Sequence, residues 1–298
     1  MSLLSSESGE WPVIILDGAM GTELTRCGVE TGLPLWSADA LLHAPEVVRQ
    51  IHADYIAAGA QVITTDTFRT NVRTLERAGI RSRQHELTSR AVQLAHEAVA
   101  QSGRRQVLVA GSIAPVEDCY SPELAPLDHE VLYREHAVLA GELADAGCNL
   151  LLIETMGTVR EAVEATRAAC GTRLPVWVSL MVGADHRLLS GETIEQAVHA
   201  ILPFAPQALL LNCLPVAQAG AALALVQQAA GAGAAIRFGV YANAGHIEEA
   251  GWSAEHTVSP VEYALASIGW RAQGASVIGG CCGTTPEHIR QLVEALRE

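Results

Sequence analysis

Lysine is absent from this chain of 298 residues. All 19 basic residues are arginines, and 33 acidic residues bring the formal net charge to −14 at pH 7. Without lysine, the chain has no side-chain amine for Schiff-base chemistry and no P-loop lysine to hold a phosphate. The acidic balance, with no basic stripe, also argues against binding to nucleic acid or to an anionic membrane surface.

A secretory signal is also missing from the sequence. The first ten residues contain neither a basic segment nor an apolar core. The seven cysteines are an odd number, which together with the missing signal argues against a disulfide framework. One uncharged stretch, residues 206–236, contains Pro215 and three glycines. We interpret it as a buried strand followed by an alanine-rich helix rather than a membrane span, and we expect a cytoplasmic protein.

Short runs rich in valine, isoleucine and leucine recur through the whole length. Each run is continuously apolar rather than alternating, which is typical of strands buried on both faces of a parallel sheet. Segments with helical patterning separate them, and no linker or GxGxxG phosphate loop is present. The sequence therefore predicts an α/β fold, a (β/α)₈ TIM barrel that forms a single domain over residues 1–298. The eight predicted strands are 13–16, 62–65, 107–110, 150–153, 176–180, 208–211, 238–241 and 276–278, and the predicted helices include 45–59, 130–147, 158–171, 194–202, 261–271 and 286–297.

Three cysteines follow two of the predicted strands. Cys213 follows the sixth strand, and Cys281 and Cys282 follow the eighth, after two glycines. One strand separates the sixth from the eighth in a barrel, so the carboxyl ends of both lie on the same rim, where barrel enzymes place their reactive residues. A set of three thiolates favours Zn²⁺ over hard cations and leaves a fourth tetrahedral position open. Three buried cysteines without a metal, or a redox-active pair at 281–282, are the alternatives.

A thiolate-bound zinc ion favours one kind of reaction. Three thiolates leave the site with a net negative charge, which makes the zinc a weak Lewis acid toward water. Metal coordination does deprotonate an incoming thiol, and the electron-rich ligands keep its sulfur nucleophilic. The sequence therefore predicts alkylation of a thiol by a cationic methyl donor, with no catalytic side chain needed beyond the metal ligands.

Seven motifs stand in order along nearly the whole chain. They are DGAMGTEL at 17–24, LPLWSA at 33–38, TTDTF at 64–68, GSIAP at 111–115, ET at 154–155, NC at 212–213 and GGCCGTTPEHI at 279–289. Together these motifs resemble the homocysteine S-methyltransferase family. This resemblance implies a barrel, a zinc ion held by Cys213, Cys281 and Cys282, and methyl transfer to the thiol of L-homocysteine, which gives methionine. The homocysteine sulfur would take the fourth position on the zinc.

The same resemblance implies which residues bind the amino acid. Asp17 and Glu154 would hold the ammonium group of homocysteine, since an ammonium needs carboxylate or carbonyl acceptors. Gly18 and Thr67 lie where the family binds the amino acid, and Asn243 matches a polar position that lines the pocket.

The methyl donor is the open part of the prediction. Cobalamin-dependent methionine synthases append further modules, whereas this chain ends soon after its last motif, so we expect a small onium donor, S-methylmethionine or S-adenosylmethionine. Trp36 matches an aromatic residue on the donor side, where a ring attracts a cation. Arg69 would repel an onium if it pointed inward, or could bind the carboxylate of the donor. A betaine-dependent enzyme and one linked to methylfolate or a corrinoid remain alternatives.

Other features leave further alternatives open. His246 and His256 follow the seventh strand, and we interpret them as surface or capping residues rather than zinc ligands. The chain could also be a barrel that binds zinc and thiols without catalysis, or its acceptor could be another thiol or a selenol. We expect small-molecule partners only, with no nucleic acid and no membrane, and the sequence does not fix the oligomeric state.

Overall fold

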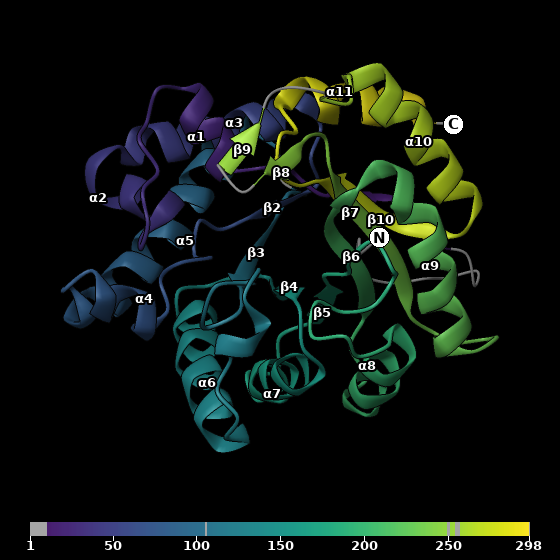
Figure 1. Cartoon of the computed structure of the whole chain (residues 1–298). Coiled ribbons are helices and arrows are strands. Elements are labelled where there is room, and N and C mark those ends of the chain that lie inside the picture. The colour runs from purple at the N-terminus through teal and green to yellow at the C-terminus, as the bar shows by residue number, and fades with distance from the viewer. Residues whose placement is uncertain (1–10, 105, 249–250, 254–256, 298) are drawn as a thin grey trace.

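A closed barrel of parallel strands forms the centre of the molecule, and helices surround it (Figure 1). The computed structural model describes residues 11–104, 106–248, 251–253 and 257–297. Eight strands pair in parallel in the order β1-β10-β7-β6-β5-β4-β3-β2. Their bounds are β1 (Ile14–Ile15), β2 (Val62–Thr64), β3 (Leu108–Ile113), β4 (Leu150–Met156), β5 (Val176–Leu180), β6 (Ala208–Pro215), β7 (Arg237–Asn243) and β10 (Ala275–Gly280).

The sheet closes between its first and last strands. Leu16 bridges Val62 in parallel, the Asp17 amide donates to the Val62 carbonyl at 3.0 Å, and the Gln61 amide donates to the Ile15 carbonyl at 2.8 Å. Closure gives hydrogen-bond partners to the backbone N–H and C=O groups of β1 and β2, which would otherwise be unpaired edge strands. The predicted (β/α)₈ barrel is therefore confirmed, and each of the eight predicted strands overlaps an observed one.

Helices follow the strands and cover the outside of the barrel. The uncharged stretch 206–236 contains β6 and the alanine-rich helix α9, as expected, and among the described residues no helix has the length and hydrophobicity of a membrane span. Short helices precede the main helix in the first two units. The helices are α1 (Gly21–Arg26), α2 (Ala40–His43), α3 (Pro45–Ala58), α4 (Val72–Arg77), α5 (Gln84–Ser102), α6 (His129–Asp145), α7 (Val159–Cys170), α8 (Ile194–Ile201), α9 (Val216–Ala230), α10 (Pro260–Ala272) and α11 (Pro286–Ala295).

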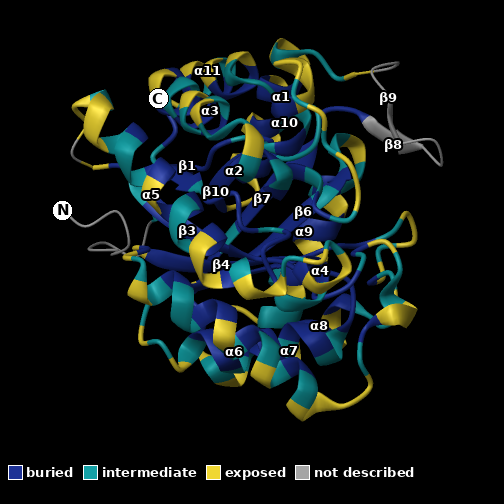
Figure 2. Ribbon diagram, turned by 90° about the vertical axis from the view of Figure 1, so that its left-hand side faces the viewer, coloured by how far each residue is buried: buried dark blue, intermediate teal, exposed yellow. Residues whose placement is uncertain are grey.

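Two apolar layers hold these elements together. Inside the barrel, Leu16, Leu152, Trp177 and Leu210 belong to one cluster of buried side chains. A second and larger cluster lies between the strands and the helices. Figure 2 shows the strands of the barrel mostly buried, with the exposed residues on the outer faces of the helices and on the loops. This pattern explains why the strand sequences are continuously apolar.

One element was not predicted. A two-stranded antiparallel sheet, β8 (His246–Glu248) and β9 (Gly251–Ser253), lies in the connection between β7 and α10. His246 belongs to β8, but the structure does not describe its side chain, and His256 lies outside the described residues. The interpretation of both histidines therefore stays a prediction.

Gly239 is a position where the barrel tolerates no side chain. A Cβ atom there would lie 2.2 Å from the Val277 carbonyl oxygen and 2.7 Å from a methyl carbon of Leu210. Because this oxygen belongs to the neighbouring strand, we expect Gly239→Ala to lower the free energy of unfolding by at least about 1–3 kcal/mol in urea denaturation. Gly141→Ala in α6 is the control, since its Cβ would meet nothing within 4 Å. Equal stability of the two variants would contradict this account of the packing.

Candidate metal and substrate site

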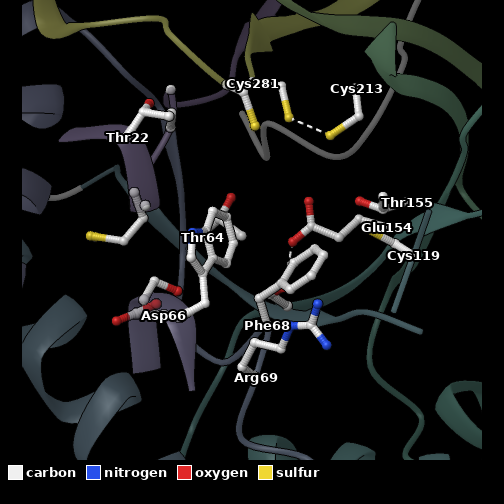
Figure 3. A pocket seen from close by; sticks show the side chains of 18 of the residues that line it. Thr22, Thr64, Asp66, Phe68, Arg69, Cys119, Glu154, Thr155, Cys213 and Cys281 are labelled. Atoms are coloured by element: carbon white, nitrogen blue, oxygen red, sulfur yellow. Dashed lines mark hydrogen bonds between the residues drawn. The ribbon is translucent and has the colours of Figure 1, made fainter. Parts of the chain in front are cut away.

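A cavity of about 570 Å³ opens at the carboxyl ends of the strands. Residues near the ends of β1, β2, β3, β4, β6, β7 and β10, or in the loops that follow these strands, line it, and Figure 3 shows many of their side chains around one space. This is the end of the barrel where the fold places reactive groups. The lining includes Asp17, Trp36, Glu154 and all three predicted metal ligands.

Cys213, Cys281 and Cys282 meet at this cavity. Their sulfur atoms all lie within 4.8 Å of one another, and the sulfur atoms of Cys213 and Cys281 are 2.7 Å apart. β7 lies between β6 and β10 in the sheet, as the sequence predicted. The three thiols therefore converge as the strand order led us to expect, and their role as metal ligands stays a prediction.

The backbone around Cys213 is irregular. Its φ angle is +55°, and the pairing of β6 with β7 shifts register between Asn212 and Pro215. A positive φ is uncommon for a residue other than glycine and costs about 1–3 kcal/mol. Side chains of a regular strand point alternately to its two faces, and this conformation interrupts the alternation at Cys213, the residue whose sulfur contacts Cys281.

Asn212 holds this irregular segment in place. Its Oδ1 atom accepts hydrogen bonds from the Thr155 amide at 3.0 Å and from the Ser179 hydroxyl at 2.7 Å. Its Nδ2 atom donates to the Thr155 hydroxyl at 2.8 Å and to the Cys213 sulfur at 3.3 Å. The fully buried amide therefore connects β4, β5 and β6 and fixes the position of one thiol. The NC motif identified the residue, but its sequence position could not reveal this role.

The glycines before Cys281 provide space rather than an unusual backbone angle. Neither Gly279 nor Gly280 has a positive φ, but a Cβ atom on Gly280 would lie 2.3 Å from the Thr284 hydroxyl, and one on Gly279 would lie 2.6 Å from Leu16 Cβ. Small residues are therefore required for the end of β10 to pack against the end of β1 and the start of α11.

Three neighbouring thiols cannot all ionise without a compensating cation. Hydrogen bonding to Cys281 and Cys282, followed by burial, raises the pKa of the Cys213 thiol well above its ordinary value. A metal ion would instead favour the ionised thiolates, because the thiols that coordinate a metal lose their protons. With metal–sulfur distances of about 2.3 Å, tetrahedral ligand atoms lie about 3.8 Å apart, so small side-chain shifts bring all three thiolates onto one ion. The donor set therefore fits a soft divalent metal such as zinc.

Asp17 is a buried carboxylate on the cavity wall. Its Oδ2 atom accepts a hydrogen bond from the Thr64 amide at 2.7 Å, and its Oδ1 atom accepts one from the Thr64 hydroxyl at 2.9 Å. Burial raises the pKa of this carboxyl from 3.8 to about 8, although both hydrogen bonds oppose the shift. The energetic cost of burying this charge falls if a cation binds beside it.

Glu154 lies on the same wall at the end of β4. One oxygen accepts a short hydrogen bond from the Ser112 hydroxyl, and the other accepts one from the Tyr241 hydroxyl at 3.4 Å. Burial raises the pKa of this carboxyl from 4.5 to about 7. Glu154 also raises the pKa of Asp17 through charge repulsion, so the two carboxyls are close enough to interact electrostatically.

Aromatic side chains line another part of the cavity. The rings of Trp36 and Phe68 pack edge to face, with their centroids 5.5 Å apart. Arg69 follows Phe68, and its guanidinium carbon lies 5.8 Å from the centre of the Phe68 ring. Arg69 also lines the cavity, as does Asp66, the central residue of the TTDTF motif, for which no role was predicted.

The remaining predicted residues have different surroundings. Gly18 lines the cavity. Thr67 is fully buried, and its hydroxyl donates to the Ser112 carbonyl at 2.7 Å. Asn243 is buried at the end of β7. Neither Thr67 nor Asn243 is among the described residues that line the cavity, so their roles in binding stay predictions.

Fold and site together define a (β/α)₈-barrel protein with a three-cysteine site in a substrate-sized cavity. The family model of homocysteine S-methyltransferase matches residues 14–296. The chain therefore belongs to the homocysteine S-methyltransferase family, a family of enzymes, and the resemblance of its motifs is confirmed.

Individual relatives agree with this assignment. Homocysteine S-methyltransferase from Escherichia coli is 32% identical, over 94% of this chain and 94% of its own length. Methionine synthase from Mycobacterium tuberculosis is 30% identical over 95% of this chain, but the chain spans only 24% of that longer protein. The metallated crystal structure of the homocysteine methyltransferase MmuM from Escherichia coli superimposes with a TM-score of 0.80 at 27% identity, over 96% of both chains.

The raised pKa of Asp17 predicts how stability depends on pH. The folded state retains a proton on this carboxyl up to about pH 8, whereas the unfolded chain loses it near pH 3.8. Between these values the folded state binds more protons, so this group lowers the free energy of unfolding as pH rises, by up to about 1.4 kcal/mol per pH unit. The substitution Asp17→Asn removes the titration but keeps both contacts with Thr64, because the Thr64 hydroxyl can accept a hydrogen bond from the new amide.

We therefore expect the metal-free variant Asp17→Asn to lose less stability than the parent protein between pH 5 and pH 8. Urea denaturation at several pH values under reducing conditions measures this difference. Parallel pH profiles for the two proteins would show that Asp17 is not protonated in the folded state at neutral pH.

Proposed function

We propose that this enzyme transfers a methyl group from a small onium donor, S-methylmethionine or S-adenosylmethionine, to the thiol of L-homocysteine, which gives methionine. The observation that carries the proposal is the meeting of three cysteine thiols and two buried carboxyls in one cavity. The thiols suit a metal that binds a sulfur substrate, and the carboxyls suit the ammonium group of an amino acid.

Cys213, Cys281 and Cys282 would hold zinc. A bound zinc ion would supply a fourth coordination position at which the thiol of homocysteine loses its proton and remains nucleophilic. Asn212 keeps Cys213 in position through its hydrogen bond to the sulfur. No other side chain is required as a base, because the metal site itself promotes loss of the thiol proton.

Asp17 and Glu154 would orient the amino-acid end of homocysteine. Both carboxyls are buried, and the pKa values of about 8 and about 7 mean that each is readily protonated when no cation is near. An ammonium group beside them favours their ionised forms and donates charge-assisted hydrogen bonds to them. Both carboxyls would therefore be ionised when the ammonium group is bound and partly protonated when it is not.

The donor side of the cavity fits a cationic methyl donor. Trp36 and Phe68 present aromatic surface there, and an aromatic ring attracts an onium group by about 0.5–2 kcal/mol. Betaine has the same kind of positive centre and is the alternative donor. A methylfolate- or corrinoid-linked reaction is the other alternative, because methionine synthase is among the relatives. We also propose a cytoplasmic location, since the odd number of cysteines in the sequence argues against a disulfide framework.

We expect Cys281→Ser to lose zinc and methionine formation together, since a serine hydroxyl is a poor zinc ligand. Zinc content after dialysis, measured by atomic emission, and methionine formation from homocysteine with each of the three onium donors provide the test. Cys27→Ser is the control, because Cys27 is exposed and distant in the sequence from every cavity cysteine. Zinc binding without turnover on any donor would contradict the activity, and a metal-free parent protein with a reversible dithiol would favour a redox role.

We expect Asn212→Asp to weaken zinc binding about 10–100-fold, the usual cost of losing a group that positions a ligand. The aspartate oxygen still accepts from the Thr155 amide and the Ser179 hydroxyl, but it cannot donate to the Cys213 sulfur, and its charge lies beside a thiolate. Competition with a chromophoric chelator measures the zinc Kd. Asn149→Asp is the matched control, because Asn149 Oδ1 accepts from the Val109 amide at 2.7 Å far from any metal ligand in sequence. Equal zinc affinity of the parent and Asn212→Asp would contradict the positioning role.

A further inference from the structure

Two oppositely charged side chains lie close together in sequence on the loop between β2 and α4. Asp66 and Arg69 are only 2% and 8% exposed, and both line the cavity. Charged residues are rarely buried to this degree unless they are paired or bind something. Homocysteine binding as proposed above uses neither of them.

Neither side chain has its charge satisfied by the described part of the chain. Both carboxylate oxygens of Asp66 are buried without a hydrogen-bond partner, and so is the Nε atom of Arg69. The ion pairs of the described residues involve neither Asp66 nor Arg69. Burial raises the pKa of the Asp66 carboxyl to about 6, and the nearby Ser37 hydroxyl opposes this shift only in part. A ligand with both charges would satisfy both groups.

The other charged groups of the cavity further restrict which ligand Asp66 and Arg69 could bind. Arg69 is the one basic side chain among the described residues that line the cavity. Asp118 is the remaining carboxylate there, and its Oδ1 atom accepts a hydrogen bond from the Tyr120 amide at 2.9 Å. Asp17 and Glu154 already provide acceptors for one ammonium group. Asp66 and Arg69 therefore form a second charged pair, which one bound amino acid does not require.

The position of this pair relative to the cysteines fits a second substrate. In Figure 3, Cys213 and Cys281 lie on one side of the cavity, Asp66 and Arg69 lie toward the opposite side, and Phe68 lies between the two groups. Phe68 is next to Arg69 in the chain, and its ring packs against Trp36. A ligand held at its far end by the charged pair can therefore extend along aromatic surface toward the sulfur atoms.

We infer that Asp66 and Arg69 form a subsite for the α-amino-acid end of a sulfonium methyl donor, in which Arg69 binds the carboxylate and Asp66 binds the ammonium group. The inference rests on the proposed methyl transfer and makes it more specific. In this reaction the donor sulfonium loses its methyl group to the homocysteine thiolate and leaves as a neutral thioether, so the charges at the amino-acid end do not change and can remain bound throughout.

The subsite distinguishes between the candidate donors. S-Methylmethionine and S-adenosylmethionine both carry an ammonium and a carboxylate on the chain attached to sulfur, so both residues contribute to their binding. Betaine has a carboxylate but no separate ammonium group, so Asp66 would be left unsatisfied. Leaving a buried charged group without a partner costs more free energy than the hydrogen bond to that partner would contribute. This penalty lowers the affinity of the cavity for betaine relative to the sulfonium donors.

Isothermal titration calorimetry of the zinc-loaded protein with S-methylmethionine, without homocysteine, tests the inference. We expect Arg69→Gln and Asp66→Asn each to raise the Kd about 10–100-fold, because each removes a charge-assisted interaction. The Kd for homocysteine should not change in either variant. Arg81→Gln is the matched control, since the Arg81 side chain is 63% exposed and pairs with Glu76 outside the cavity.

A comparison on the parent protein needs no substitution. Trimethylsulfonium keeps the sulfonium but lacks the amino-acid end, so it should bind at least about 100-fold more weakly than S-methylmethionine. S-Adenosylmethionine, titrated in parallel, reveals whether the cavity also accepts the adenosyl group. Equal affinity for S-methylmethionine and trimethylsulfonium, an unchanged Kd in Arg69→Gln, or a loss confined to homocysteine would each overturn the inference.

These outcomes are separate from those of the proposed function. If S-methylmethionine binding depends on Arg69 and Asp66 but no donor yields methionine, the subsite stands and the methyl transfer fails. If methionine forms from betaine, and neither variant affects donor binding, the methyl transfer stands and the subsite fails.

Discussion

The convergence of three thiols at the mouth of the barrel is the constraint on which the rest of the site depends. Cys213 reaches this point from β6 through a positive φ angle, and Cys281 and Cys282 reach it from the end of β10. β7 separates the two strands, so the closed sheet and its register set the distance between the sulfur atoms. Asn212 links this arrangement to β4 and β5 through its hydrogen bonds. The site is therefore held by the barrel rather than by a flexible loop.

Electrostatics gives the cavity a preference for cations. Its walls carry buried carboxyls and four thiols, one of them that of Cys119, against one guanidinium among the described lining residues. Burial raises the pKa of Asp17, Asp66 and Glu154, so these carboxyls hold protons more readily and partly neutralise the charge of the cavity. Under the proposed function, a bound metal, ammonium or onium group would replace those protons. The same negative surroundings would lower the energy of a positively charged methyl donor beside the sulfur atoms.

The fold and the meeting of the three cysteines could be predicted because both follow from regular geometry. Continuous apolar runs identified the eight strands, and the order of strands in a barrel brought Cys213 close to Cys281. Features that depend on side-chain direction could not be predicted. Thr67 shares a motif with Asp66, but its hydroxyl bonds the Ser112 carbonyl, whereas Asp66 lines the cavity. The hydrogen bonds of Asn212 join segments 57 and 33 residues apart, which no local pattern reveals.

In the proposed function, three cysteines hold one zinc ion and leave a position for the sulfur of the substrate. Zinc K-edge X-ray absorption of the zinc-loaded protein, recorded before and after homocysteine is added, measures the ligand set directly. We expect three sulfur atoms at about 2.3 Å from the zinc and one lighter ligand before homocysteine is added, and four sulfur atoms afterwards. A sulfur count that does not rise when homocysteine binds, or fewer than three sulfur ligands at the start, would contradict the proposal.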